Sequence, residues 1–313
     1  MMRKLPRVTT TSEQGFVLVA VLWILAALSA LAMIFAVYLS NSAQALAVSD
    51  AGLKAEAVVS ASVELTVYQL SLAGDKARPM EGAFHYRLDN ADIDVSFVSE
   101  AARIDLNVAP KELLANLFAG LGASPEDAGQ YADRIIGWRT PPKADAAEDE
   151  VSLYRAAGLA YSPRQAPFAH VNELALVLGL PPALVDRALP FVTVFSGSPK
   201  INVLVAAPEV IAALPGMTPS GLKEFLKERP ALPKDMPAIA TALGPAQANA
   251  TIEKNDFFRV LTTVKFDNGR RTASEVVIGL GGEEDPYRVL SWQDEVEAAA
   301  SRAPKLSDGG DDL

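Results

Sequence analysis

An unbroken apolar run near the start dominates the pattern of hydrophobic and polar positions along the chain. Residues 16–39 contain no charged residue and no proline. Such a run can cross the hydrocarbon core of a bilayer as a helix, which takes about 20 residues. Basic residues precede the run, and no charge follows it until Asp50. Because positive residues stay on the cytoplasmic side, we expect a single pass with the N-terminus inside.

A helical period continues beyond the apolar run. Residues 40–73 contain no proline, and their apolar positions recur at the spacing of one helical face: Val59, Val63, Val67 and Leu70. Gly74 is typical of the position just past a helix end. The pattern predicts one helix from about residue 17 to residue 73, roughly 85 Å long.

Four strand-like stretches occur in two pairs that lie far apart in the sequence, and in one of them Ile93, Val95 and Phe97 alternate with polar residues. Residues 83–88 and 92–98 form the first pair, and residues 257–266 and 271–280 form the second. Asp267-Asn268-Gly269 is a strong hairpin signal within the second pair. The simplest architecture is α+β: a long helix packed on a small antiparallel sheet, with a large helical insertion between the two pairs.

The insertion contains an internal repeat. The stretch RIDLNVAPKELLANL (103–117) aligns with KINVLVAAPEVIAAL (200–214). Each begins extended, turns at alanine or proline, and enters a helix with an acid in its first turn, which the helix dipole favours. A second helix follows in both, a layout that resembles SAM-like or helix-hairpin-helix modules. Leu204 stands where the first copy has Asn107, and we expect this change to weaken the turn without removing the fold.

Composition and charge exclude several classes of function. The chain has 313 residues, a formal net charge of −10 and no cysteine. Phosphate binding needs basic patches, so no broad nucleic-acid face is expected. Without cysteine there are no disulfides, thiolate metal sites or cysteine nucleophiles. No hydrolase, phosphate-loop or zinc-protease motif occurs, and His85 and His170 are interpreted as ordinary surface or packing residues. We therefore predict that the protein is not an enzyme.

Three interpretations of the apolar run compete. It is a simple anchor, a secretory signal cleaved after Ala45-Leu46-Ala47, or a processed segment kept in the mature chain. The apolar part of a secretory signal has about 7–15 residues, which is shorter than this run. The basic leader, Gly15, Phe16 and the long apolar helix resemble the type IV prepilin signal. That resemblance implies cleavage between Gly15 and Phe16 by prepilin peptidase, methylation of the new N-terminus, and a helix retained as the packing core of a filament.

The order of motifs resembles the K-type minor pseudopilins of type II secretion, the general secretion pathway protein K family. The stretches that follow one another as in that family are RIDLNVAPKELLANL, RIIGWR, ADAAEDEVSLY, PFAHVNELALVLGL and INVLVAAPEVIAALPGM. Ala20 is the fifth residue of the implied mature chain, where most pilins carry a glutamate that neutralises the N-terminal amine of the adjoining subunit. A subunit without this acid suits the end of a filament, since an unpaired charge in an apolar core is costly.

The resemblance implies a type IV pilin-like fold with two inserted SAM-like modules and a role in nucleating and capping the pseudopilus, for export of folded proteins across the outer membrane. The implied partners are the minor pseudopilins of the I and J types, then the H type, together with the major pseudopilin, prepilin peptidase and the inner membrane, with no nucleic acid. The implied location is the inner membrane, with the N-terminus cytoplasmic and the C-terminal domain periplasmic, and the pseudopilus tip after assembly.

These features divide the chain into seven segments. They are a leader (1–15), a transmembrane and assembly helix (16–39), a first pilin-like part (40–100), two SAM-like modules (101–199 and 200–255), a second part of the pilin-like sheet (256–282) and a flexible acidic tail (283–313).

An acidic loop is a candidate ion site. Calcium takes six to eight oxygen ligands, and the stretch Asp145-Ala-Ala-Glu148-Asp149-Glu150 offers several. The resemblance implies calcium in the helical domain, with Glu148 and Asp149 as the first candidate ligands. The alternative is a solvated acidic loop without a bound ion.

Other functions compete with the pseudopilin interpretation. One is a membrane-anchored periplasmic helix-hairpin-helix protein that binds DNA during competence uptake. Another is a secreted hydrolase, which the absence of a convergent nucleophile and base disfavours. A tip protein of a fimbrial system is the nearest neighbour, and the helical insertion and Ala20 argue against it.

Overall fold

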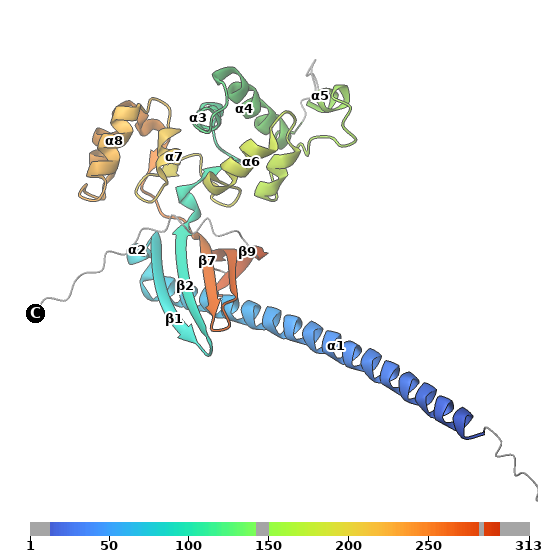
Figure 1. Cartoon of the computed structure of the whole chain (residues 1–313). Coiled ribbons are helices and arrows are strands. Elements are labelled where there is room, and N and C mark those ends of the chain that lie inside the picture. The colour runs from blue at the N-terminus through green and yellow to red at the C-terminus, as the bar shows by residue number, and fades with distance from the viewer. Residues whose placement is uncertain (1–12, 142–149, 282–284, 295–313) are drawn as a thin grey trace, which may run out of the picture. The chain divides into compact units, whose positions relative to one another are not determined.

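The structure is a computed structural model that describes residues 13–141, 150–281 and 285–294 (Figure 1). The chain divides into two compact units, Met1–Val58 and Val59–Leu313. Helix α1 (Glu13–Leu72) contributes its first part to one unit and its last part to the other, and it confirms the predicted long helix. Gly74 has φ +63°, a left-handed conformation that suits glycine after a helix end. The short helix α2 (Gly74–Ala77) follows.

Five antiparallel strands form one sheet in the order β1-β2-β7-β8-β9. Their bounds are Glu81–Leu88 (β1), Ala91–Ser99 (β2), Phe257–Phe266 (β7), Arg271–Leu280 (β8) and Tyr287–Asp294 (β9). The first four confirm the two predicted strand pairs. Strands β2 and β7 are direct neighbours, and Ser99 at the end of β2 pairs with Phe258 near the start of β7. The insertion therefore leaves and re-enters the sheet between adjacent strands.

The fifth strand corrects a prediction from the sequence. The acid-rich composition predicts a flexible tail from residue 283, which is wrong for the residues of β9. Trp292 of β9 pairs with Val276 of β8, and the Ser274 hydroxyl donates to the Asp294 carboxylate at 2.7 Å. These contacts hold β9 at the edge of the sheet. Residues 295–313 lie outside the described residues.

The last part of α1 packs on one face of the sheet. The buried residues of α1 there are Val59, Ser62, Val63, Thr66, Val67 and Leu70, and β2 buries Ile93, Val95 and Phe97 by strict alternation. Polar contacts join the helix to both edges of the sheet: the Ser62 and Tyr86 hydroxyls are 2.8 Å apart, and the Tyr287 hydroxyl donates to Glu64 at 2.7 Å. Helix and sheet together bury the apolar core of this part of the chain.

The insertion folds into two helical modules. The first contains η1 (Glu100–Ala102), β3 (Ile104–Asp105), α3 (Lys111–Gly120), α4 (Pro125–Arg139), α5 (Glu150–Ala156), η2 (Val171–Leu176), α6 (Pro182–Ala188), η3 (Leu189–Phe191) and β4 (Val192–Thr193). The second contains β5 (Ile201–Asn202), α7 (Pro208–Ala212), α8 (Pro219–Glu228), α9 (Met236–Leu243), η4 (Gly244–Asn249) and β6 (Ala250–Thr251). In each module the opening strand pairs in parallel with the closing strand, β3 with β4 and β5 with β6.

Candidate functional sites: the apolar helix, the repeated turns and the Glu100 joint

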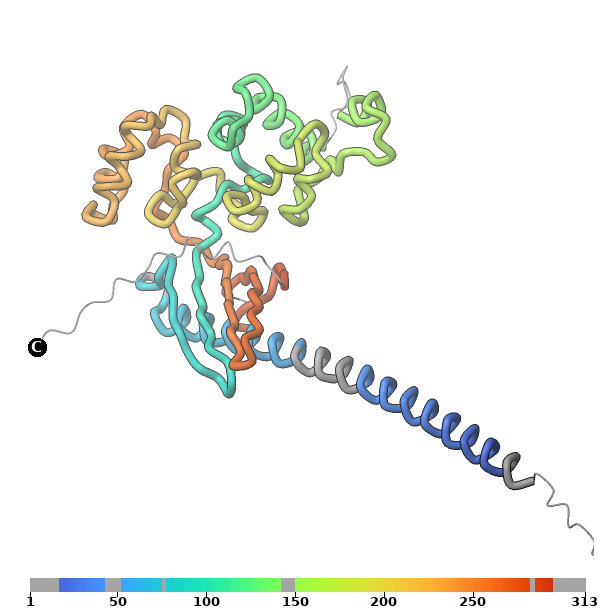
Figure 2. The backbone as a smooth tube through the Cα atoms, viewed as in Figure 1, coloured from blue at the N-terminus to red at the C-terminus, as the bar shows by residue number. Residues whose placement is uncertain are grey.

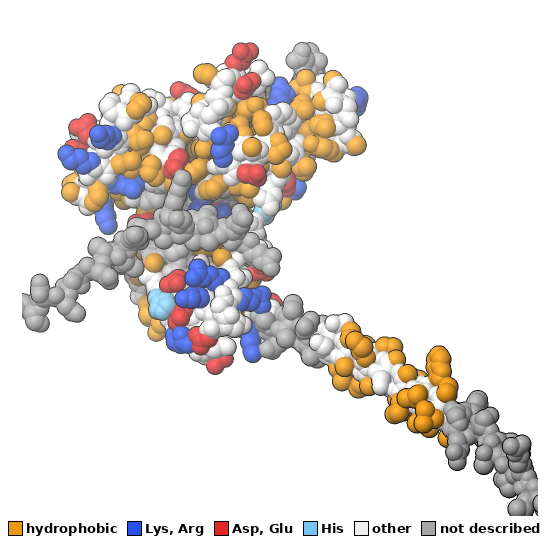
Figure 3. All heavy atoms as spheres, viewed as in Figure 1, with side chains coloured by type: hydrophobic (Ala, Val, Ile, Leu, Met, Phe, Trp, Pro, Cys, Tyr) orange, Lys and Arg blue, Asp and Glu red, His pale blue; other side chains and the backbone are white. Residues whose placement is uncertain are grey.

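The N-terminal part of α1 is an exposed apolar helix. Val17–Ser42 has a mean hydropathy of 2.8 and is not buried within the structure, and it is the one candidate membrane span in the described chain. Figure 3 shows hydrophobic side chains along this part of the helix. Ala20 lies within it, and Gly15 and Phe16 lie in the first turn of α1. Cleavage between Gly15 and Phe16 stays a prediction.

Both modules open with the same turn. In the first, the Asp105 side chain accepts the backbone N–H of Asn107 at 2.8 Å. In the second, the Asn202 side chain accepts the N–H of Leu204 at 3.1 Å. The side chain that closes the turn is therefore two residues before Leu204, and position 204 supplies its backbone N–H to this bond. The expected weakening of the turn stays a prediction.

The Asn107 side chain binds a neighbouring loop, unlike Leu204 at the equivalent place in the second module. Its side-chain oxygen accepts the N–H of Phe168 at 2.7 Å, and its amide donates to the Phe168 carbonyl at 3.1 Å. These bonds attach the loop before η2 to the opening turn of the first module. Leu204 instead packs against the apolar core of the helical modules.

Two arginines at equivalent places support the two turns. Each follows or ends the second helix of its hairpin and donates to two carbonyl oxygens of the opening turn. The acceptors are Leu106 and Ala109 (2.7 Å) for Arg139, and Val203 (3.4 Å) and Ala206 (2.8 Å) for Arg229. Burial lowers the pKa of both guanidinium groups from the ordinary value. Sequence reasoning missed this pair, although both hairpin stretches end in arginine.

The first hairpin is unsuited to phosphate binding. At the start of α4 the Ser124 hydroxyl accepts the N–H of Asp127 at 3.1 Å and donates to the Asp127 carboxylate at 2.7 Å. Glu126 adds a second acid to the same turn. These carboxylates already satisfy the positive end of the helix dipole and would repel a nucleic-acid backbone. The DNA-binding alternative is therefore not favoured.

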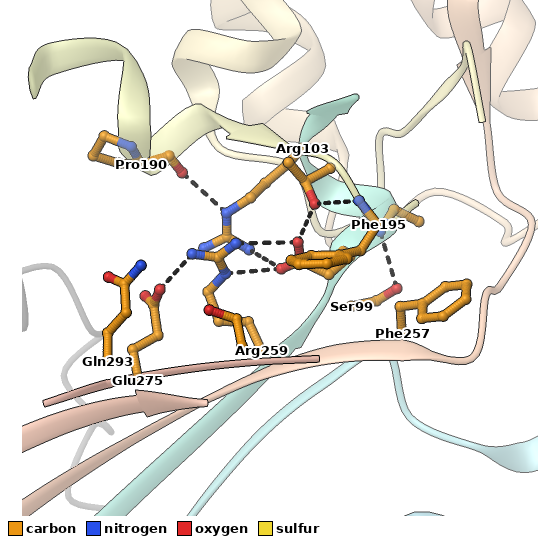
Figure 4. Close-up of polar contacts among 12 residues, drawn as sticks. Ser99, Arg103, Pro190, Phe195, Phe257, Arg259, Glu275 and Gln293 are labelled. Carbon is orange, nitrogen blue, oxygen red and sulfur yellow. Dashed lines mark hydrogen bonds and ion pairs between the residues drawn. The ribbon is translucent and has the colours of Figure 1, made fainter. Parts of the chain in front are cut away.

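A buried carboxylate lies where the chain leaves the sheet. Glu100 follows β2 directly and has no solvent exposure. Its Oε1 accepts from Arg259 Nε at 2.8 Å and from Arg103 at 3.3 Å, and its Oε2 accepts from a second Arg259 nitrogen at 3.1 Å. The Thr193 hydroxyl also donates to Oε2. Figure 4 shows the polar contacts of Arg103 and Arg259, with Glu275 on the side of the sheet and Pro190 on the side of the first module.

The network around Glu100 has two acids and two bases. Burial alone would raise the pKa of Glu100, but the charges of Arg259 and Arg103 and the hydrogen bonds from Arg259 and Thr193 lower it overall. Arg259 also donates to Glu275 of β8 at 2.5 Å, and these carboxylates outweigh burial to raise its pKa. Burial and the neighbouring Arg259 charge lower the pKa of Arg103 to about 10. We call these four residues the Glu100 network.

Further polar contacts join the sheet to the modules. Ser99 and the side-chain amide of Asn255 are 2.6 Å apart. The ring of His170 accepts the N–H of Asn172 through Nδ1 at 3.1 Å, which leaves Nε2 for the β9 side chains of Ser291 (3.3 Å) and Gln293 (3.1 Å). His170 therefore links the start of η2 to the edge strand, whereas His85 lies exposed on β1 beside Asp94.

The predicted calcium ligands, Glu148 and Asp149, lie outside the described residues. The next acid, Glu150, accepts from Arg134 at 2.9 Å. Among the described residues, no group of three or more His, Asp or Glu side chains is placed to hold a metal ion. Calcium stays a prediction.

Comparisons with known proteins identify the middle of the chain. Residues 94–197 match the family model described as "Type II secretion system (T2SS), protein K". Over these residues, about a third of its length, the chain is similar to the type II secretion system protein K family. A similar curated protein is the type II secretion system protein K of Klebsiella pneumoniae, 30% identical over 117 residues, or 36% of this chain. The match spans 35% of that relative, about a third of its length.

A solved structure extends the likeness beyond this domain. It is a chain in the crystal structure of the GspK-GspI-GspJ complex from the type 2 secretion system of enterotoxigenic Escherichia coli. The TM-score is 0.58 at 16% identity, and the match covers 77% of this chain and 95% of that one. At this identity the likeness shows the fold. The resemblance to K-type pseudopilins is confirmed for the protein K domain, and the predicted α+β pseudopilin-like fold is confirmed.

Replacing Glu100 by glutamine tests the network. A Glu100→Gln substitution leaves two buried arginines short of a counter-charge, and we expect it to lower the free energy of unfolding by about 3–5 kcal/mol at pH 7. Because the network lowers the pKa of Glu100, its stabilisation is present above the ordinary range of about pH 4 and is lost as pH falls below it. The difference between wild type and variant should therefore shrink towards pH 3, measured by denaturation of the full chain in detergent.

A matched control is Asp92→Asn, which breaks an exposed ion pair with Arg87 on the same sheet. This variant should change stability little at either pH. A wild-type advantage over Glu100→Gln that is equally large at pH 3 and pH 7 would contradict the ionised role of Glu100.

Proposed function

We propose that this protein is a K-type minor pseudopilin that nucleates and caps the pseudopilus of a type II secretion system, and so supports export of folded proteins across the outer membrane. The observation that carries the proposal is a protein K domain inserted between adjacent strands β2 and β7 of a sheet preceded by a long apolar helix. Assembly through the helix needs no catalytic residue.

The apolar helix supports the proposed location. Val17–Ser42 is long and apolar enough for a single membrane anchor. In the proposal the anchor lies in the inner membrane with the N-terminus in the cytoplasm and the sheet and modules in the periplasm. After removal of residues 1–15, the same helix packs against partner helices. Ala20 brings no carboxylate for the amine of an adjoining subunit, and this suits an end position.

The proposed partners follow from the related complex. The similar solved structure is a complex of three proteins, GspK, GspI and GspJ. We propose that this chain likewise forms a tip complex with I-type and J-type minor pseudopilins of its own system, followed by the H type and the major pseudopilin. In this position the insertion caps the filament, because a region of some 150 residues attached to the end of a small sheet obstructs stacking of a further subunit.

A shortened chain tests the capping role. Because Ser99 and Phe258 are paired neighbours, residues 100–257 can be replaced by an Asn-Gly hairpin turn that keeps the sheet continuous. The intact chain should co-purify from detergent with the I-type and J-type pseudopilins and mark only the ends of pseudopili. The shortened chain should keep the partners but also enter the filament body, as seen by immunogold labelling.

Two results would contradict the proposal. Failure of the intact chain to co-purify with either partner would remove the assignment to the tip complex. A shortened chain that binds both partners and still marks only filament ends would show that the insertion is not what limits stacking.

We also propose that calcium binds near Glu148 and Asp149 in the first module. A ligand that binds only the folded state raises stability, so calcium should raise the thermal midpoint of the full chain. Glu148→Gln with Asp149→Asn should abolish this rise and the heat of calcium titration. Glu126 is an exposed acid elsewhere in the module, and Glu126→Gln should keep both. An unchanged midpoint with calcium would reject the site.

A further inference from the structure

The sheet and the helical modules have separate apolar cores. One connected core is built from buried residues between Ile104 and Ala250, with partly buried neighbours as far as Ile252. Residues of the five-stranded sheet and of α1 bury their own apolar side chains outside this core. Each part therefore has its own hydrophobic driving force, and neither needs the other to exclude water from its interior.

The chain passes between the two parts at two neighbouring places. It leaves the sheet after Ser99 and returns to it at Phe257, and these ends lie on adjacent strands. Figure 2 lets the reader follow both crossings. Two crossings so close together restrain translation of the modules relative to the sheet. They leave the modules free to rotate about the line that joins the crossings. Other contacts must fix that rotation.

Charged and polar contacts join the two parts, and at the second crossing Lys254 donates to the Arg78 carbonyl at 2.7 Å. Arg259 of the sheet binds Glu100 at the first crossing, and Thr193 of the first module donates to the same carboxylate. Arg103 donates through Nε to the Pro190 carbonyl of the first module at 3.1 Å. On the β9 side, His170 contacts Ser291 and Gln293.

We infer that the Glu100 network is a latch that fixes the orientation of the helical modules on the sheet, and that breaking it lets the modules rotate as a rigid body with both cores intact.

A buried charge network favours two discrete orientations of the modules over a continuous range of orientations. Glu100 is fully buried, and Arg259 has about a tenth of its side chain exposed. Such charges are compensated only while donors and acceptors keep hydrogen-bonding geometry, because each becomes costly when left without its partner. A small rotation of the modules therefore loses most of the attraction between Glu100 and its arginines at once. The separated charged groups are then hydrated instead. Glu275, at 20% exposure, lies on the solvent side and can be removed with the rest in place.

The absence of cysteine makes the latch directly measurable. Two cysteines introduced at exposed Lys265 of β7 and Lys223 of α8 can carry spin labels without competing thiols. Pulsed electron resonance on the full chain in detergent would report the distance between sheet and modules. A second pair, at Arg155 of α5 and Lys223, lies within the modules and reports whether their own fold is intact.

The latch predicts graded effects of the substitutions on the distance between sheet and modules. Wild type should give one narrow distance distribution between sheet and modules. Glu275→Gln should broaden it slightly, Glu100→Gln should broaden it several-fold or add a second distance, and Asp92→Asn should leave it unchanged. The pair within the modules should stay narrow in all four proteins.

Two results would overturn the inference. A narrow, unshifted sheet-to-module distance in Glu100→Gln would mean that packing, not the network, sets the orientation. Broadening of the pair within the modules in Glu275→Gln and Glu100→Gln would mean that the modules unfold when the network is disturbed, so they do not move as a rigid body.

Discussion

The architecture depends on one buried carboxylate, that of Glu100. Glu100 has no exposure, and burying such a charge without partners would cost several kcal/mol. The fold supplies Arg259 from the sheet, Arg103 from the first crossing and Thr193 from the first module. Thr193 and Arg259 come from segments about 90 and 160 residues away in the chain and meet Glu100 only when strand pairing and module folding are both complete. One residue thus couples the formation of the sheet to the placement of the insertion.

The insertion itself is a duplication with unequal copies. The opening turn, the parallel pairing of the short strands and the arginine that supports the turn recur in both modules. The first copy adds a loop that Asn107 attaches through Phe168, and the second has Leu204 in that place. A pilin-like sheet can carry so large an addition because it leaves from one strand and returns on the adjacent one. The strand register is then undisturbed.

Long periodic elements could be predicted from the sequence, and isolated polar contacts could not. The helix through Leu70 and the strand residues Ile93, Val95 and Phe97 repeat one physical preference many times, so the pattern survives without tertiary knowledge. Strand β9 was missed because its acid-rich surroundings resemble a solvated tail, while its stability comes from pairing with β8. Glu100, Arg139 and Arg229 look like surface charges until partners distant in sequence are known. The Gly15–Phe16 junction and the Glu148–Asp149 pair rest on resemblance to a family and not on described contacts.

The proposed assembly requires α1 to be a retained pilin-type helix, not a plain anchor or a discarded signal. Its continuity from Glu13 to Leu72, with an apolar first part and a last part embedded on the sheet, fits a helix that serves first in a membrane and then in an assembly. The most direct measurement is N-terminal mass spectrometry of the protein from membranes with and without prepilin peptidase. A retained pilin-type helix predicts a chain that begins at methylated Phe16 only when the peptidase is present. A chain that begins at Met1 both with and without the peptidase, or a chain that begins near Val48, would contradict it.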